Sequence, residues 1–500
     1  MNRRLKIFLL LASLLLLLAA LTLLFVRVQP GNELAAYQAA LRAQGEKLDL
    51  PAALPPPAGP DENGAPDLDD AVHLLGNTTD YAQPFQMVAP GRAVTFWCLP
   101  VTYDGRSTNA WDELRISLAD HQPALALLRQ ALNRPKLDFG LKYDPDPNLP
   151  MRQISIMRQA ARELATTTLL NLHDGDPGQA TTNLLAILAI AQRDWRDYFI
   201  ISLMVRAGIT SIGTETTWEL LQTTNVTDEQ LAAVQGSWQQ LNFLKDAEST
   251  FAVERLWTAG IIEKARASHA NFTKFFGGAA SSPTTTWEAM SEAPRYVTAE
   301  ALWRSSWSFT QELQLLQRNQ IILEALRAMQ TNASLFYKAD YDRMMTRLAS
   351  LGGASRSTPV LRTLAIPDFH EVAGQDLSRL VLRTLRSDTE CRLLVTAIAL
   401  KRFQLQHGQF PDTLAELTPA YLPAVIIDPF DGKPLKYRSN GDGTFLLYSV
   451  GEDGTDDGGD AGSPSGRPES WAWTRNRDWV WPQPATPAEM QFFLEHPPVK

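Results

Sequence analysis

The feature that most constrains the fold is an uncharged run of twenty residues near the N-terminus, from Ile7 to Val26. A helix rises about 1.5 Å per residue, so this run spans about 30 Å, the thickness of a hydrocarbon core. Arg3, Arg4 and Lys6 precede the run, and flanking positive charges favour the cytoplasmic side. We therefore expect a single-pass anchor in the inner (cytoplasmic) membrane, with the N-terminus in the cytoplasm and the bulk periplasmic.

The alternative is a cleaved signal peptide. Its apolar region is usually about 7–15 residues long and is followed by a small-residue cleavage site. The run here is longer, and the sequence "FVRVQPG" after it contains no A-x-A pattern. These features favour an uncleaved signal anchor.

Charge and cysteine content narrow the class of protein. The chain has 500 residues and a net charge of −9, and no basic stripe that could neutralise a phosphate backbone, so nucleic acid is not expected as a partner. Only Cys98 and Cys391 are present, too few for a disulfide scaffold. They could pair in an oxidising compartment or remain two buried thiols.

The spacing of apolar residues and the positions of segments rich in proline and glycine predict a mainly α protein. Its expected parts are an N-terminal transmembrane helix, an irregular α-helical domain and a C-terminal α+β module. Residues 45–70 are rich in proline and acid, which is typical of a semi-rigid, extended linker. The predicted divisions are a cytoplasmic tip and anchor (1–30), a short helix and Pro-rich linker (31–110), a helical domain (111–350), a linker (351–375), an α+β module (376–460) and a Trp-rich tail (461–500).

The helical domain is predicted from apolar residues at helical spacing. Residues 151–194 read as two helices joined by "HDGDPG", with Asp176 as N-cap and Pro177 in the first turn. The apolar stripes of these helices indicate a core, and an irregular bundle or solenoid is expected. Further helices are expected at 196–222, at 228–245 (capped by Thr227 or Asp228), at 246–268 and at about 297–347.

The C-terminal module shows a different pattern. A helix is expected over 387–406, capped by Ser387 or Asp388 and ended by Gly408. Thr413-x-x-Glu416 is a capping box for a second, short helix. Two strand-like runs, "PLKYR" and "TFLLYSV", flank Asn440-Gly441, a hairpin signal. An acidic, glycine-rich loop follows the second run.

The order of these short motifs resembles the globular domain of the major pseudopilin of type II secretion systems. That family has a long helix, then D-P-W-G-x-P-Y-x-Y, then S-x-G-x-D-G with a loop rich in glycine and aspartate. Asp428-Pro429-Phe430 and Gly432-Lys433-Pro434 stand for the first element, and Ser449, Gly451, Asp453 and Gly454 for the second. The resemblance covers about 70 residues, 390–460.

The resemblance implies a calcium ion in the acidic loop. Asp453 is then the best ligand candidate, and Asp456, Asp457 and Asp460 are further candidates. Ca²⁺ takes six to eight oxygen ligands, and glycines let a backbone wrap the ion. The alternative is a solvated acidic turn after a hairpin, where Gly and Asp are common.

The chain departs from the family in four ways. Phe430 replaces the tryptophan, Asp431 is inserted, and "AGSPSG" follows Asp460 where the family has a closing acidic element. The N-terminal run also lacks the glutamate of a processed pilus subunit. The whole layout resembles a family of bacterial membrane-anchored proteins to which no activity is attached.

The tail holds alternating tryptophans, Trp471, Trp473, Trp479 and Trp481, which would lie on one face of a strand. They either pack back on the module or form a binding surface.

The seven histidines lack metal-ligand spacing, and no nucleophile elbow, Walker A loop or dinucleotide fingerprint occurs. We therefore expect a structural or interaction protein of the bacterial envelope beside a secretion or pilus-like assembly, with a protein partner there. An envelope enzyme with a site in the helical domain is the alternative.

Overall fold

The computed structural model describes residues 29–76, 88, 110–146, 149–276, 299–351, 377–461, 477–488 and 491. The predicted anchor at 7–26, Cys98, Trp471 and Trp473 lie outside these ranges. Of the helices inside them, none has both the length and the apolar character that crossing a bilayer requires.

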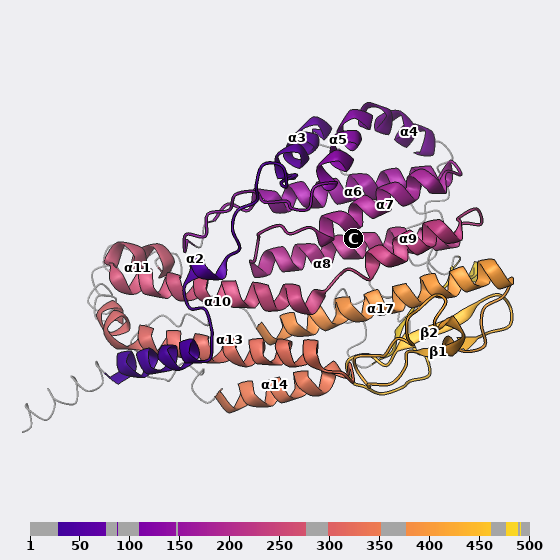
Figure 1. The fold of residues 1–500 in the computed structure, drawn as a ribbon. Coiled ribbons are helices and arrows are strands. Elements are labelled where there is room, and N and C mark those ends of the chain that lie inside the picture. The colour runs from indigo at the N-terminus through magenta and orange to yellow at the C-terminus, as the bar shows by residue number, and fades with distance from the viewer. Residues whose placement is uncertain are drawn as a thin grey trace, which may run out of the picture.

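The described chain is mainly helical, as expected, and its helices stack in successive rows with a small sheet at one end (Figure 1). After a helical segment at 29–43, the helices are α2 Leu50–Ala53, α3 Ala65–Leu75, α4 Ala110–Asp120, α5 Gln122–Leu132, α6 Arg152–His173, α7 Pro177–Gln192, α8 Ile200–Gln222, α9 Asp228–Trp238, α10 Phe243–Ala267, α11 His269–Phe276, the π-helical turn η1 Trp303–Trp307, α13 Ser308–Thr331, α14 Tyr337–Leu351, α17 Leu377–His407 and the 3₁₀ turn η2 Leu414–Leu417. The strands are β1 Lys436–Ser439, β2 Phe445–Ser449 and β3 Trp479–Val480.

Local capping signals are confirmed. The Asp176 side chain accepts from the Gln179 amide at the start of α7. Thr227 forms a capping box at the start of α9, and Thr413 forms the expected one with Glu416. Because these motifs need only residues within one turn, they act independently of the tertiary fold.

The expected single helix over 297–347 is wrong, because the chain breaks between α13 and α14. The backbone of Asn332 adopts an extended conformation. Its side-chain nitrogen donates to Asp340 at 2.7 Å, and its side-chain oxygen accepts from the Ser334 amide at 3.0 Å. Leu335 has a φ of +57°. The asparagine side chain thus replaces the helical hydrogen bonds that the next turn would have made.

The expected start of the C-terminal helix at Ser387 or Asp388 is also wrong, since α17 begins at Leu377. Asp388 lies inside the helix, where it pairs with Arg392 at 2.6 Å. The hydroxyl of Thr389 donates to the Leu385 carbonyl at 2.8 Å. Polar residues that cap helices elsewhere are here satisfied by i,i+4 contacts, so the helix continues through them. Gly408, with a φ of +77°, follows its end as expected.

The Pro-rich stretch does not hold the body at a distance. We call residues 44–64 the strap, and it runs along the helical body. The Ala58 amide donates to Asp138 Oδ2 at 3.1 Å, and Asn63 Nδ2 donates to the Asp138 carbonyl at 2.7 Å. Residues 65–70, expected as linker, begin α3, whose Leu68 is fully buried. A stripe at helical spacing buries one face of α3, which explains the helix.

The hairpin is confirmed, with β1 antiparallel to β2 and Lys436 opposite Tyr448. β3 adds to the other side of β2, giving the order β1-β2-β3. The tail therefore returns to the module, and Trp479 and Trp481 are both buried. One continuous apolar core runs from Leu68 in α3 to Trp481, so helical body and module share their interior.

Candidate functional site

The acidic loop leaves β2 directly and is folded by its own aspartates. Asp453 Oδ1 accepts from the Thr455 amide at 2.9 Å. Asp456 Oδ1 accepts from the Gly458 amide at 3.0 Å and from the Tyr448 hydroxyl at 2.9 Å. Asp460 pairs with Arg477 at 2.9 Å. These three aspartates and Asp457 are exposed.

A fifth acid, Asp478, joins this loop and was missed from the sequence. Its side chain is fully buried, and its Oδ2 accepts from the Gly459 amide at 2.7 Å. Its Oδ1 is buried without a hydrogen-bond partner. Burial, together with the charges of Asp456 and Asp457, raises the pKa of Asp478 to about 6. No local signal could have found it, because 18 residues separate it from Asp460.

The carboxylates of the acidic loop and of Asp478 are suitable ligands for a calcium ion, but their positions do not form a coordination site. Carboxylates beside glycines are the donors that Ca²⁺ prefers, and the unpartnered oxygen of Asp478 is free to bind a cation. Within the parts of the chain that the structure describes, however, no three acidic, histidine or cysteine side chains are grouped so as to hold a metal ion. The loop oxygens serve amide and hydroxyl donors instead.

The two motifs that carry the family resemblance meet at Asp428. This buried carboxylate accepts from the Phe430 amide at 3.0 Å, the Val450 amide at 2.8 Å and the Ser449 hydroxyl at 2.9 Å. Burial raises its pKa, and the three donors oppose that shift. Phe430 packs edge-on against Trp479, with ring centroids 4.9 Å apart. Asp428 thus fixes the turn before β1 to the start of the acidic loop.

Polar contacts also fix the module to the helical body. The indole nitrogen of Trp218 in α8 donates to the Pro482 carbonyl at 3.0 Å. Gln235 in α9 donates to the Tyr421 carbonyl at 2.7 Å. Within the module, Arg386 in α17 forms an ion pair with Glu452 beside the loop. The contacts from α8 and α9 give the module a defined orientation on the body.

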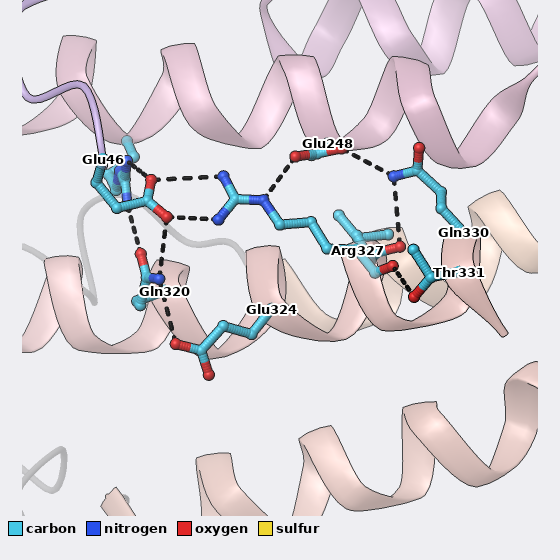
Figure 2. A network of polar contacts seen from close by, with 9 residues as sticks. Glu46, Glu248, Gln320, Glu324, Arg327, Gln330 and Thr331 are labelled. Atoms are coloured by element: carbon cyan, nitrogen blue, oxygen red, sulfur yellow. Dashed lines mark hydrogen bonds and ion pairs between the residues drawn. The ribbon is translucent and has the colours of Figure 1, made fainter. Parts of the chain in front are cut away.

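A second polar cluster lies at the opposite end of the chain, where Glu46 of the strap enters between α10 and α13 (Figure 2). Arg255 donates to Glu46 at 3.0 Å, and Arg327 forms an ion pair with it. Gln320 donates to Glu46 at 3.2 Å. Arg327 also pairs with Glu248 at 2.6 Å, so the network crosses from one helix to the other.

The electrostatics of this network favour a charged Glu46. Burial alone would raise its pKa, but hydrogen bonds from Arg327, Gln320 and Arg255 lower it to about 2. The Glu46 side chain is 7% exposed and that of Arg255 only 1%. A buried ion pair with these extra hydrogen bonds holds the strap in one position. No sequence motif predicts it, because Glu46 lies more than 200 positions from both Arg255 and Arg327.

A third cluster is acidic, and no arginine or lysine of the described residues forms an ion pair with it. Glu390 of α17 is 4% exposed, and its Oε1 has no hydrogen-bond partner. Burial raises its pKa well above the usual value, and nearby Glu215 of α8 raises it further. Burial also raises the pKa of Glu215 to about 7. Two carboxyls on α8 and α17 therefore lie close enough to interact, and burial favours the protonated form of both.

Comparison with protein-family models, with curated proteins and with solved structures returned no match to this chain.

Proposed function

We propose that this chain is a membrane-anchored interaction protein of the bacterial envelope, which presents its C-terminal module to a protein partner on the periplasmic side. The partner belongs to a secretion or pilus-like assembly. The proposal rests on the apolar run at 7–26 together with one observation, the way Glu46 joins the following segment to the body.

The contacts of the strap with the helical body support this role. A flexible linker would let the body and module sample many orientations above the membrane. Glu46 instead holds the strap between α10 and α13, and α17 continues from the body into the module. An anchor joined in this way would present the module at a fixed height and orientation, which is useful for assembling with a partner.

The partner is tested by photo-crosslinking in living cells. A crosslinking residue replaces Arg438, which is exposed on β1, the strand at the edge of the sheet. The matched control places it at Ile116 of α4, which is 73% exposed at the far end of the body. We expect an adduct with an envelope protein from position 438 and none from 116. Adducts from neither position in membrane fractions, or a chain found outside the membrane, would contradict the proposal.

We also propose that the acidic loop binds calcium as a structural ion through Asp453, Asp456, Asp457 and Asp460, with Asp478 as a further ligand. The support is the unpartnered buried oxygen of Asp478 beside two carboxylates. Binding would exchange the amide contacts of the loop for contacts with the ion, because calcium requires six to eight oxygens.

Thermal unfolding of the full chain in detergent tests this proposal. A ligand at a hundred times its Kd stabilises the native state by about 2.7 kcal/mol, so millimolar Ca²⁺ should raise the unfolding temperature relative to chelator. The increase should disappear in Asp453→Ala and Asp478→Asn and persist in Asp412→Asn, an exposed aspartate outside the loop. An unchanged unfolding temperature at every calcium level would leave the loop an acidic turn.

A further inference from the structure

A cavity of about 330 Å³ lies between the strap and the helical body. Its apolar walls come from Leu48 and Leu50 of the strap, Leu256 of α10 and Leu316 of α13. This volume is at the lower end of the range of about 300–1,000 Å³ for small-molecule sites. The cavity is separate from the acidic loop, which belongs to the module at the other end of the fold (Figure 1).

The wall of the cavity opposite the strap is held by hydrogen bonds and by close backbone packing. The Tyr143 hydroxyl donates to the Arg196 carbonyl and accepts from the Tyr198 amide, both at 2.8 Å. A Cβ on Gly260 would lie 2.6 Å from the ring of Pro145, so glycine is what lets the 143–145 segment lie against α10. The cavity is therefore bounded by fixed backbone on one side and by the strap on the other.

The charges that line the cavity are all negative. Asp49, Glu263 and Glu312 contribute carboxylates, and its lining includes no lysine or arginine. Glu312 is neutralised by Arg266 and accepts from Gln38 at 3.0 Å. Asp49 and Glu263 are exposed, and neither has an ion-pair partner among the residues that the structure describes. Two unneutralised carboxylates thus stand beside an apolar interior.

We propose that this cavity binds a small aliphatic amine of the diamine or polyamine class. The methylene chain would lie against the leucine walls, where burial of each CH₂ contributes about 0.8 kcal/mol. An ammonium group would lie beside Asp49 and Glu263, where it stays partly hydrated and meets two carboxylates that lack a partner. Anions are disfavoured by the same two charges, and a neutral chain leaves them unmatched.

Occupancy would also act on the strap. Leu48, Asp49 and Leu50 follow Glu46 within four residues, so a ligand that contacts them adds to the contacts that hold the strap on α10 and α13. By linkage, a ligand that binds only the docked strap shifts the strap toward that position. The amine would therefore reduce local opening of residues 46–53.

Calorimetric titration of the full chain in detergent with 1,5-diaminopentane tests the proposal. We expect saturable binding that weakens about fivefold in Glu263→Gln and in Asp49→Asn, since an exposed ion pair is worth up to about 1 kcal/mol. Glu113→Gln, an exposed glutamate of α4 outside the cavity, should bind as the parent does. Hydrogen exchange of residues 46–53 should slow when the amine is bound.

The neutral comparator is 1,5-pentanediol, which has the same chain with hydroxyls in place of the ammonium groups. It should bind at least about tenfold more weakly, because it forms no ion pair with either carboxylate. Equal affinity for diol and diamine, unchanged affinity in both carboxylate variants, or no saturable binding of the amine at millimolar concentration would each overturn the proposal. Because the readouts are affinity and exchange, they do not depend on the membrane location or on the partner of the module.

Discussion

Two buried glutamates of this molecule, Glu46 and Glu390, have opposite electrostatic environments. Glu46 meets Arg255, Arg327 and Gln320, and its pKa falls to about 2 in spite of burial. Glu390 meets another carboxyl, Glu215, and its pKa rises well above the usual value. Both side chains are largely buried, but burial dominates only at Glu390, whereas hydrogen bonds from arginine and glutamine outweigh it at Glu46.

The hydrogen bonds around each group agree with this difference. The Glu46 carboxylate accepts hydrogen bonds from Arg255, Gln320 and Arg327. Near Glu390, the hydrogen bond from the Thr214 hydroxyl lowers the pKa of Glu390 but does not outweigh the effect of burial. Glu46 thus joins its elements by charge, whereas the α8–α17 contact favours the protonated form of its acids.

The largest effect should follow removal of the cation from Glu46. Arg255→Ala leaves a buried carboxylate without its least exposed partner, and breaking such a pair typically costs about 3–5 kcal/mol. Urea unfolding of the full chain measures this loss. Arg115→Ala removes an arginine that is 45% exposed and paired with Asp174, and it should cost less than about 1 kcal/mol. Similar losses of unfolding free energy in the two variants would show that burial does not strengthen the stabilising effect of the Glu46 ion pair.

The acid pair should make stability depend on pH. The folded pKa of Glu215 lies at about 7, above its ordinary value of 4.5. The folded state therefore holds more protons than the unfolded state between these values, so its stabilisation is complete below pH 4.5 and is lost as pH rises through 7. At about 1.4 kcal/mol per pH unit, the loss between pH 5 and pH 8 is about 2 kcal/mol.

Glu215→Gln isolates this term, because the amide cannot ionise and burial of the carboxyl is what raises the pKa of Glu215. The variant should match the parent at pH 5 and exceed its unfolding free energy by about 2 kcal/mol at pH 8. Glu113→Gln, an exposed substitution of the same kind, should leave the pH profile unchanged. Parallel profiles of parent and Glu215→Gln would mean that Glu215 is ionised in the fold at pH 5.

The smallest effect should come from Arg327→Ala. The Arg327 side chain is 41% exposed, and Arg255 would still neutralise Glu46. We expect a loss of about 1 kcal/mol by urea unfolding, well below that of Arg255→Ala. Arg327→Lys separates charge from geometry, because lysine keeps the charge and loses the fork that reaches both Glu46 and Glu248. A loss equal to that of Arg255→Ala would show that exposure is no guide within this network.

The sequence predicts those parts of the fold that are decided within a turn or a hairpin. Asp176, Thr227 and Thr413 cap as expected, and Asn440-Gly441 begins the turn between β1 and β2. The break at Asn332 escapes prediction because neither glycine nor proline marks it. The true start of α17 was not predicted, because the residue types that cap helices also form i,i+4 contacts inside them.

The candidate sites were less predictable than the fold. The aspartates of the loop are visible as a run, but Asp478 reaches them only after the tail returns as β3. Glu46 and Arg327 are separated by 281 positions, and the docking of the strap on α13 brings them together. Such pairs are fixed by tertiary structure, and neither composition nor periodicity carries information about them.

The hydrogen bond from Trp218 to Pro482 has a consequence for how the chain matures. The two residues lie 264 positions apart. At a synthesis rate of about 5–20 residues per second, the ribosome needs about 15–50 s to supply the second after the first. Throughout that interval the tail is absent from its site on α8. We therefore expect the body to reach its final packing only after β3 has been made.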